Sequence, residues 1–174
     1  MKRALVVVYS CTGNSRLVAQ RLADDMAWPV AEIRELHARA GASGMLRCVL
    51  DSLLARRPPI EYDGPPVGEF ALVVLVAPIW MSRLAGPMRS FVAERERSLP
   101  AVAVVNTMNS GGAVNAVAEI AHLLHRPPVE AIAFTASEIE QERMDVRLRE
   151  FGNALAASVE GRPLPSRTAV PETA

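Results

Sequence analysis

Two short runs in the middle of the chain are apolar at every position. They are Leu72–Ala77 (LVVLVA) and Ala101–Val105 (AVAVV). A strand with one face in water alternates apolar and polar residues, so a strand that is apolar throughout is expected to be covered on both faces. A parallel sheet between two layers of helices meets that requirement. These runs therefore favour an α/β fold.

The rest of the pattern alternates strand-like and helix-like segments. The predicted strands are Ala4–Tyr9, Val30–Leu36, Leu72–Ala77, Ala101–Thr107 and Ala131–Thr135. The predicted helices are Ser15–Met26, Met45–Ala55, Pro87–Arg97, Ala113–Leu124 and Ile139–Val159. Because the two kinds alternate, we expect parallel strands joined by right-handed crossovers, in a domain of three layers.

One domain, residues 1–160, accounts for this pattern. The chain has 174 residues, half of them hydrophobic, which is enough for one substantial core. Within residues 40–66, the predicted helix Met45–Ala55 is followed by prolines, which indicates a helix and a stiff surface connection. Residues 161–174 contain prolines and no apolar period, so this tail is predicted to be disordered.

Charge and cysteine content argue against several classes of protein. Lys plus Arg and Asp plus Glu are equal at 19 each, whereas a nucleic-acid-binding surface calls for a basic excess. Two cysteines, Cys11 and Cys48, form no CxxC pair and no disulfide framework, so a reduced, cytoplasmic setting is expected. The N-terminal apolar run is too short for a signal sequence. No segment approaches the roughly 20 apolar residues of a membrane span, so we expect no membrane partner.

The first predicted strand ends in small polar residues, and a helical pattern follows at once. The first N–H groups of a helix have no partner within it, and the macrodipole adds roughly half a positive charge there. A phosphate can be held at such a terminus by amides and hydroxyls, without a lysine. The loop is therefore a predicted anion site, and the alternative is an ordinary N-cap loop. Its residues are Ser10, Cys11, Thr12, Gly13, Asn14 and Ser15.

Two further loops follow the third and fourth predicted strands. Ligands of an open parallel sheet bind beyond the carboxyl ends of its strands, so these loops are expected to share one site with the first. The second loop contains Pro78, Ile79, Trp80 and Met81. The third runs over Asn106–Gly112, and its candidate site residues are Asn109, Ser110, Gly111 and Gly112.

These loops resemble those of a known family. Ser10-Cys11-Thr12-Gly13-Asn14-Ser15 matches the phosphate-loop pattern S/T-x-T-G-N-T/S at every defined position, and on this motif the chain resembles the flavodoxin-like family of FMN-binding proteins. Pro78-Ile79-Trp80 resembles the family's second flavin loop, and Asn109-Ser110-Gly111-Gly112 stands where the third belongs. The resemblance spans about residues 1–161. It implies a three-layer flavodoxin-like fold, a five-stranded parallel sheet of order 2-1-3-4-5 without a long insertion, and FMN as cofactor.

The resemblance also implies roles for the first loop. The hydroxyls of Ser10, Thr12 and Ser15, with the amides of residues 12–15, would satisfy the phosphate oxygens of FMN. Gly13 would permit close backbone approach or a positive φ. From the residues alone, without the resemblance, this loop is an anion site that contains no charged side chain.

Trp80 would offer a π face beside the flavin ring and so influence its potential. The alternative is a tryptophan that packs against the helix that begins at Pro87. Gly111 and Gly112 would let backbone amides approach the edge of the ring, and the same glycines can relieve a tight strand-to-helix turn.

Two departures from the family bear on function. The third loop carries Met108 and Asn109 but no aromatic residue, and the chain is neutral whereas many electron-carrying flavodoxins are acidic. Both weaken the interpretation as a pure carrier. Two functions stay open: an electron-transfer module that serves a redox partner protein, and an NAD(P)H-dependent reductase of quinones, flavins or other small acceptors. Neither requires a side chain as acid or base.

Other chemistries fit the residues less well. Cys11 and Arg16 enclose four residues, whereas the tyrosine phosphatase loop needs five. A receiver domain needs an acid after the first strand, and a dinucleotide-binding fold needs G-x-G-x-x-G; both are absent. The histidines show no metal-ligand spacing. Arg47, Arg56 and Arg57 are interpreted as a solvated face, with contact to a nucleotide phosphate or redox partner as the alternative.

Overall fold

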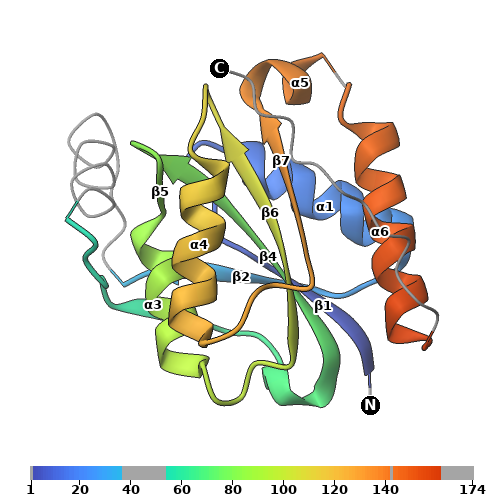
Figure 1. The fold of residues 1–174 in the computed structure, drawn as a ribbon, viewed down its shortest axis with the longest axis horizontal. Helices are drawn as coiled ribbons and strands as arrows, with labels where there is room; N and C mark the ends of the chain where they lie inside the picture. The colour runs from blue at the N-terminus through green and yellow to red at the C-terminus, as the bar shows by residue number, and fades with distance from the viewer. Residues whose placement is uncertain (1, 37–53, 142, 162–174) are drawn as a thin grey trace.

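The sheet is built on strands that run parallel. The computed structural model describes residues 2–36, 54–141 and 143–161. The parallel strands are β1 (Lys2–Val8), β2 (Val30–Glu35), β4 (Phe70–Trp80), β6 (Ala101–Met108) and β7 (Glu130–Thr135). Their order across the sheet is β2-β1-β4-β6-β7, which is the predicted order 2-1-3-4-5 (Figure 1). The predicted α/β fold class is confirmed.

The five parallel strands are not the whole of the sheet. The described residues add two short antiparallel strands, β3 (Ile60–Tyr62) beside β2 and β5 (Arg83–Leu84) beside the end of β4. The strand β5 exists because the chain reverses at Met81 and Ser82, where φ is 49° and 59°. Strands of two or three residues have no detectable alternation, so the sequence pattern contains no signal for them.

Helices cover both faces of the sheet. α1 (Asn14–Met26) and α6 (Asp145–Val159) pack on one face, and α3 (Gly86–Arg95) and α4 (Ala113–Leu124) on the other (Figure 1). The predicted helix Met45–Ala55 lies outside the described residues except for its last two, which form a turn. The tail from residue 162 also lies outside them, so its disorder stays a prediction. Within the described chain, no helix has the length and apolarity of a membrane span.

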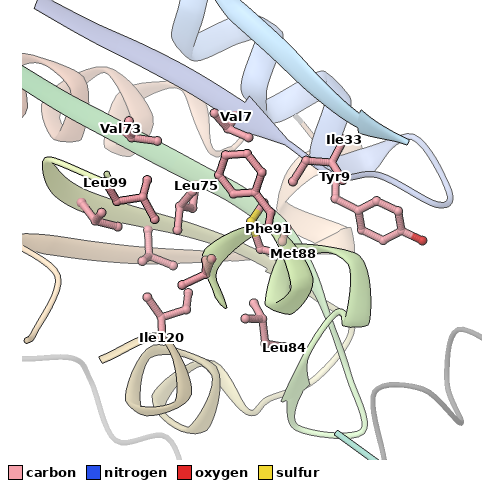
Figure 2. Close-up of a cluster of buried hydrophobic side chains, with 14 of the residues drawn as sticks. Val7, Tyr9, Ile33, Val73, Leu75, Leu84, Met88, Phe91, Leu99 and Ile120 are labelled. Carbon is pink, nitrogen blue, oxygen red and sulfur yellow. The ribbon is translucent and has the colours of Figure 1, made fainter. Parts of the chain in front are cut away.

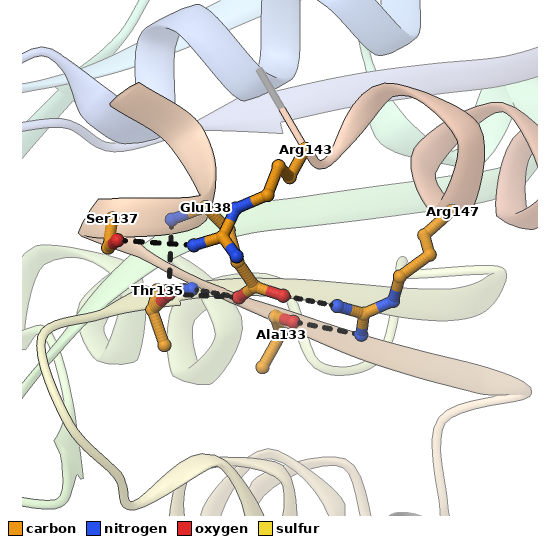
Figure 3. A network of polar contacts seen from close by, with 6 residues as sticks. All are labelled: Ala133, Thr135, Ser137, Glu138, Arg143 and Arg147. Atoms are coloured by element: carbon orange, nitrogen blue, oxygen red, sulfur yellow. Dashed lines mark hydrogen bonds and ion pairs between the residues drawn. The ribbon is translucent and has the colours of Figure 1, made fainter. Parts of the chain in front are cut away.

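The predicted helix Ile139–Val159 is in fact two helices, and Figure 3 shows the polar network that links them. α5 (Ala136–Glu140) is started by a capping box, in which the Glu138 carboxylate accepts from the backbone and hydroxyl of Thr135 at 2.8 and 3.0 Å. The chain then turns, Met144 enters the core with 1% of its surface exposed, and α6 begins. Arg147 of α6 donates back to Glu138 at 2.7 Å.

The two faces of the sheet carry separate apolar cores. On β6, Val102 and Val104 face α3 and α4, whereas Ala103 and Val105 face α1 and α6. All four side chains are buried. Figure 2 shows part of the core under α3 and α4. The fully apolar runs therefore arise as the sequence predicts, because successive side chains of a strand point to opposite, equally covered faces.

Candidate functional site

Three loops meet at the carboxyl edge of the sheet and enclose one cavity of about 170 Å³. The arrowheads of β6 and β7 point to this edge at the top of Figure 1, away from the N-terminus. Since β4 lies between β1 and β6, its end is flanked by the β1–α1 and β6–α4 loops. The lining residues are Thr12, Asn14, Pro78, Ile79, Trp80, Thr107, Met108 and Asn109.

The first wall of the cavity is the start of α1. Its N-cap is Gly13, with φ 103° and ψ −26°, no side chain caps the helix, and its first turn has no acid. The Gly13 N–H donates to the Ser10 hydroxyl at 3.1 Å. A Cβ at Gly13 would meet no atom within 4 Å, so the backbone angle, and not a lack of space, calls for glycine here. Uncapped amides at an exposed loop form the anion-binding geometry that the sequence predicts.

Ser15 differs from its expected role. Its side chain is 2% exposed, and its hydroxyl shares a hydrogen bond of 2.7 Å with the Thr107 hydroxyl of β6. The hydroxyl therefore joins α1 to the sheet, and only the Ser15 amide stays with the predicted anion site. The burial stripe of α1 could have indicated this, since Ser15 precedes buried Val18 and Ala19 by three and four residues.

The second wall is the end of β4 with its hairpin. Pro78 and Ile79 are buried, whereas Trp80 is half-buried, packs against the core under α3 and α4, and also lines the cavity. Both interpretations of Trp80 thus describe part of its surroundings. Its Nε1 atom is buried, so the indole surface that lines the cavity is carbon. Met81, at the turn, is 65% exposed and does not line the cavity.

The third wall leads into α4. Its N-cap is Gly112, with φ 98° and ψ 5°, and again no side chain caps the helix. A Cβ at Gly112 would lie 2.4 Å from the Ser82 Cα, so this glycine is required both by its backbone angle and by the hairpin against it. Gly111 has open space around it and no positive φ.

The structure brings the three predicted loops together, but not every predicted residue reaches the cavity. Those that line it are Thr12, Asn14, Pro78, Ile79, Trp80 and Asn109. Those that lie on the same loops without lining it are Ser10, Cys11, Gly13, Ser15, Met81, Ser110, Gly111 and Gly112. Thr107 and Met108 line the cavity too; the sequence places both in the third loop but not among the expected cofactor-binding residues. Register provides the missing signal, since Thr107 pairs with Pro78 across the sheet.

Two polar groups at this end of the sheet lack a hydrogen-bond partner among the described residues. They are the Trp80 indole N–H and the side-chain amide of Asn106, a residue with no exposed surface on β6. A buried polar group without a partner is unfavourable unless water or a ligand supplies one. The end of β4 and β6 is thus the part of the described sheet where polar groups are least satisfied.

The cavity is electrically neutral. Its lining contains no titratable side chain. Arg16, the first charged residue after the first loop, is ion-paired with Glu32.

The two clearly shifted pKa values among the described groups lie elsewhere. Burial raises the pKa of Tyr62, which the charge of Arg95 only partly opposes.

The second shifted group is Glu138, in the network that joins α5 to α6. Burial alone would raise the pKa of Glu138, but hydrogen bonds from Thr135 and the charges of Arg147 and Arg143 outweigh it. The pKa of Glu138 therefore lies below its ordinary value. Its charge serves the fold and not the cavity.

A second hollow, of about 360 Å³, lies at the opposite edge of the sheet and is lined by residues such as Met26, Trp28 and Phe70. Its charged members are engaged, since Lys2 pairs with Glu69 at 2.9 Å and Arg3 with Glu160 at 3.3 Å. None of the α-helices of the described chain begins there. Despite its larger volume, this hollow lacks the uncapped amides that distinguish the carboxyl edge.

Fold and site together define an open-sheet α/β protein with an uncapped helix terminus at the carboxyl edge. No protein-family model and no curated protein matches the chain. Solved structures do. A flavoprotein from Lactobacillus acidophilus in complex with FMN superposes with a TM-score of 0.67 at 17% identity, over 81% of this chain and 98% of that one. Oxidised flavodoxin 2 from Bacillus cereus matches with a TM-score of 0.58 at 15% identity, over 90% of this chain and 99% of that one.

A flavodoxin, WrbA-like protein from Agrobacterium tumefaciens matches as well, with a TM-score of 0.55 at 11% identity, over 94% of this chain and 100% of that one. Identities this low carry information on the fold alone. The chain therefore has a flavodoxin-like fold, as its first loop predicts.

Proposed function

We propose that the chain binds FMN noncovalently in the cavity at the carboxyl edge and transfers electrons through it. The observation that carries the proposal is that an uncapped helix terminus and a half-buried indole line the same cavity. FMN has the matching parts, a doubly charged phosphate at one end and a flat aromatic ring at the other. The FMN complex of the structural relative from Lactobacillus acidophilus supports the same assignment.

The phosphate end of the proposal rests on α1. Thr12 and Asn14 line the cavity where the helix begins, no side chain caps the first amides, and no acid in the first turn would repel an anion. The Ser10 hydroxyl accepts from Gly13, which supports the positive φ that turns the loop toward the helix. Amides and the Thr12 hydroxyl would together donate to the phosphate.

The ring end rests on Trp80 and the apolar lining. The cavity offers carbon surface from Pro78, Ile79 and Met108 as well as the indole, which suits a flat aromatic ligand. Its volume of about 170 Å³ is below the roughly 300–1,000 Å³ of sites that enclose a whole ligand. Part of the flavin would therefore stay at the surface, where an electron donor or acceptor can reach it.

FMN supplies the redox chemistry when it is bound. The chain would hold the phosphate, orient the ring and set the polarity around it. Since the described lining has no titratable side chain, we assign no acid or base. Because the lining carries no negative side chain, it would not repel the negative charge that a flavin gains on reduction.

A second function, an NAD(P)H-dependent reductase of quinones or other small acceptors, is favoured by one observation. The third loop presents exposed Asn109, Ser110 and Gly111 and no aromatic side chain, so one face of the ring would be open to a nicotinamide or a small acceptor. A pure electron carrier has less use for an open face.

The binding proposal is tested by titrating the purified protein with FMN, riboflavin and FAD in a calorimeter, with Thr12→Val as the matched variant. We expect FMN to bind tightest, and the protein to carry a flavin absorption spectrum when purified. A protein that is colourless and gives no binding heat with FMN would refute the proposal.

Carrier and reductase are then separated by mixing the FMN-loaded protein with NADH or NADPH under nitrogen. Rapid bleaching of the flavin absorption, with no second protein present, is expected of a reductase. Bleaching that requires an added reductase protein is expected of a carrier.

A further inference from the structure

An ion pair between a buried arginine and a partly buried glutamate lies directly beneath the hairpin that carries Trp80. Arg89 of α3 is 2% exposed. Its guanidinium donates to the Leu84 carbonyl oxygen at 2.9 Å, to the Arg56 carbonyl oxygen at 2.9 Å, and through Nε to the carboxylate of Glu119 on α4. The same carboxylate accepts from the Leu84 N–H at 3.3 Å. Both backbone groups of Leu84 are thus held by the one pair.

Leu84 belongs to the strand that pairs with the end of β4. In the β4–β5 ladder, Leu84 lies opposite Ile79, and Arg83 lies opposite Trp80. Two cavity-lining residues, Ile79 and Trp80, are therefore paired with a strand whose position Arg89 and Glu119 fix.

The hairpin needs such support. The strand β5 has two residues, and the turn before it holds Met81 and Ser82 at positive φ, which is unfavourable for side chains other than glycine. A strained turn on a two-residue ladder persists when surrounding contacts over-determine it. Those contacts are Gly112 against Ser82 on one side and the ion pair against Leu84 on the other.

The chemistry of the pair also points to position and not to stability. Buried ion pairs are often no more stabilising than apolar side chains of the same size, because both charges lose their hydration. What an arginine adds is a planar fork that donates in several fixed directions at once. Here the fork joins α3, α4, β5 and the segment at Arg56.

We propose that Arg89 and Glu119 are positioning residues that fix the hairpin of Trp80, and so preset the ring-binding wall without touching the ligand. The ligand half of this inference rests on the proposed FMN site. The half that concerns Trp80 does not, and it can be measured in the protein without flavin.

The first experiment measures Trp80 alone. Trp28→Phe removes the other tryptophan of the chain, and Arg89→Lys and Glu119→Gln are made in that background. We expect the Trp80 emission to shift to the red and its quenching by acrylamide to rise about threefold, since a loosened hairpin exposes more of the indole. Arg126→Lys is the matched control, because Arg126 also donates to two backbone carbonyls, those of Leu99 and Pro100, but just before β6 begins, at the far edge of the sheet.

The second experiment compares riboflavin, which lacks the phosphate, with FMN. The Glu119→Gln variant should raise both dissociation constants about tenfold and leave their ratio unchanged, because only the ring wall is altered. Thr12→Val should raise the dissociation constant of FMN and leave that of riboflavin unchanged. The ratio of the riboflavin constant to the FMN constant should therefore fall. Arg126→Lys should change neither constant.

The outcomes separate the possibilities. A fall in melting temperature with unchanged Trp80 emission and unchanged riboflavin affinity would mean that the pair is merely structural and would overturn the inference. If Arg89→Lys does not fold, Glu119→Gln decides, since it keeps the shape of the pair. If the parent protein binds no flavin, the proposed function fails, while the Trp80 measurement still supports or rejects the positioning role.

Discussion

Replacing Ser15 by alanine should lower the stability of the protein and leave FMN affinity unchanged. The Ser15 hydroxyl is buried and bonded to Thr107 at 2.7 Å, and Thr107 is itself 4% exposed. Removing one partner strands the other in an apolar setting, which costs about 1–3 kcal/mol. The phosphate loop keeps its amides and the Thr12 hydroxyl, so the anion site should lose nothing.

A double-mutant cycle measures the coupling free energy between the Ser15 and Thr107 hydroxyls. Thr107→Val should cost a similar amount, about 1–3 kcal/mol, because it strands the Ser15 hydroxyl. The double variant removes both polar groups, so its loss should be smaller than the sum of the two by about 1 kcal/mol or more. Urea unfolding followed by circular dichroism measures all four proteins, and a flavin titration measures their FMN affinity.

Two results would contradict the structural role of the Ser15 hydroxyl. If Ser15→Ala unfolds at the same urea concentration as the parent and weakens FMN binding tenfold or more, the hydroxyl serves the phosphate as the loop motif alone suggests. Additive effects of Ser15→Ala and Thr107→Val on unfolding would equally show that the two hydroxyls are not coupled.

Four other substitutions have distinct expected results. Thr12→Val should weaken FMN binding by about 1–3 kcal/mol in a flavin titration, with urea unfolding unchanged, because it removes a hydroxyl from the charged end of the site. Gly112→Ala should destabilise by about 2–5 kcal/mol in urea unfolding, because its Cβ meets the Ser82 backbone at 2.4 Å and its φ is 98°. Gly13→Ala, with a similar φ and open space, should cost only about 1–2 kcal/mol. Glu138→Gln should lower the free energy of unfolding at neutral pH, and the difference from the parent should shrink as pH falls below the ordinary pKa of glutamate and through the lowered pKa of Glu138, because the carboxylate stabilises the fold only while it is charged.

Each of these can fail in a recognisable way. Unchanged FMN affinity in Thr12→Val would remove the phosphate from the start of α1. Equal losses in Gly112→Ala and Gly13→Ala would mean that the hairpin yields to the new methyl group. A stability difference for Glu138→Gln that stays constant as pH falls from neutral into the acid range would assign it to shape and not to charge.

The sequence predicts the parallel sheet well because the apolar pattern of each strand depends directly on which of its two faces are covered. Val102–Val105 are apolar on both faces since α3 and α4 cover one and α1 and α6 the other. The division into α5 and α6 was beyond reach, because it depends on Met144 entering a core formed by distant helices. The hairpin depends likewise on contacts from Gly112 and Arg89, residues that follow it in the chain.

The site shows the same limit. The loop motif locates Thr12, Gly13 and Asn14 correctly at the start of α1, because strand end and helix start are local events. It does not give the direction of the Ser15 side chain, which the helical burial stripe determines. Cavity residues contributed by strand register, such as Thr107, become visible only when the neighbouring strand is known.

The glycine caps of α1 and α4 have a thermodynamic consequence. A serine or aspartate cap is typically worth about 1 kcal/mol to a helix, but the positive φ of both positions, and the Ser82 backbone against Gly112, disfavour one here. The protein forgoes that gain wherever no acceptor arrives from outside. A ligand whose oxygens accept from these amides would supply the missing hydrogen bonds. Ligand binding should therefore raise the free energy of unfolding, and more so as the occupancy of the site increases.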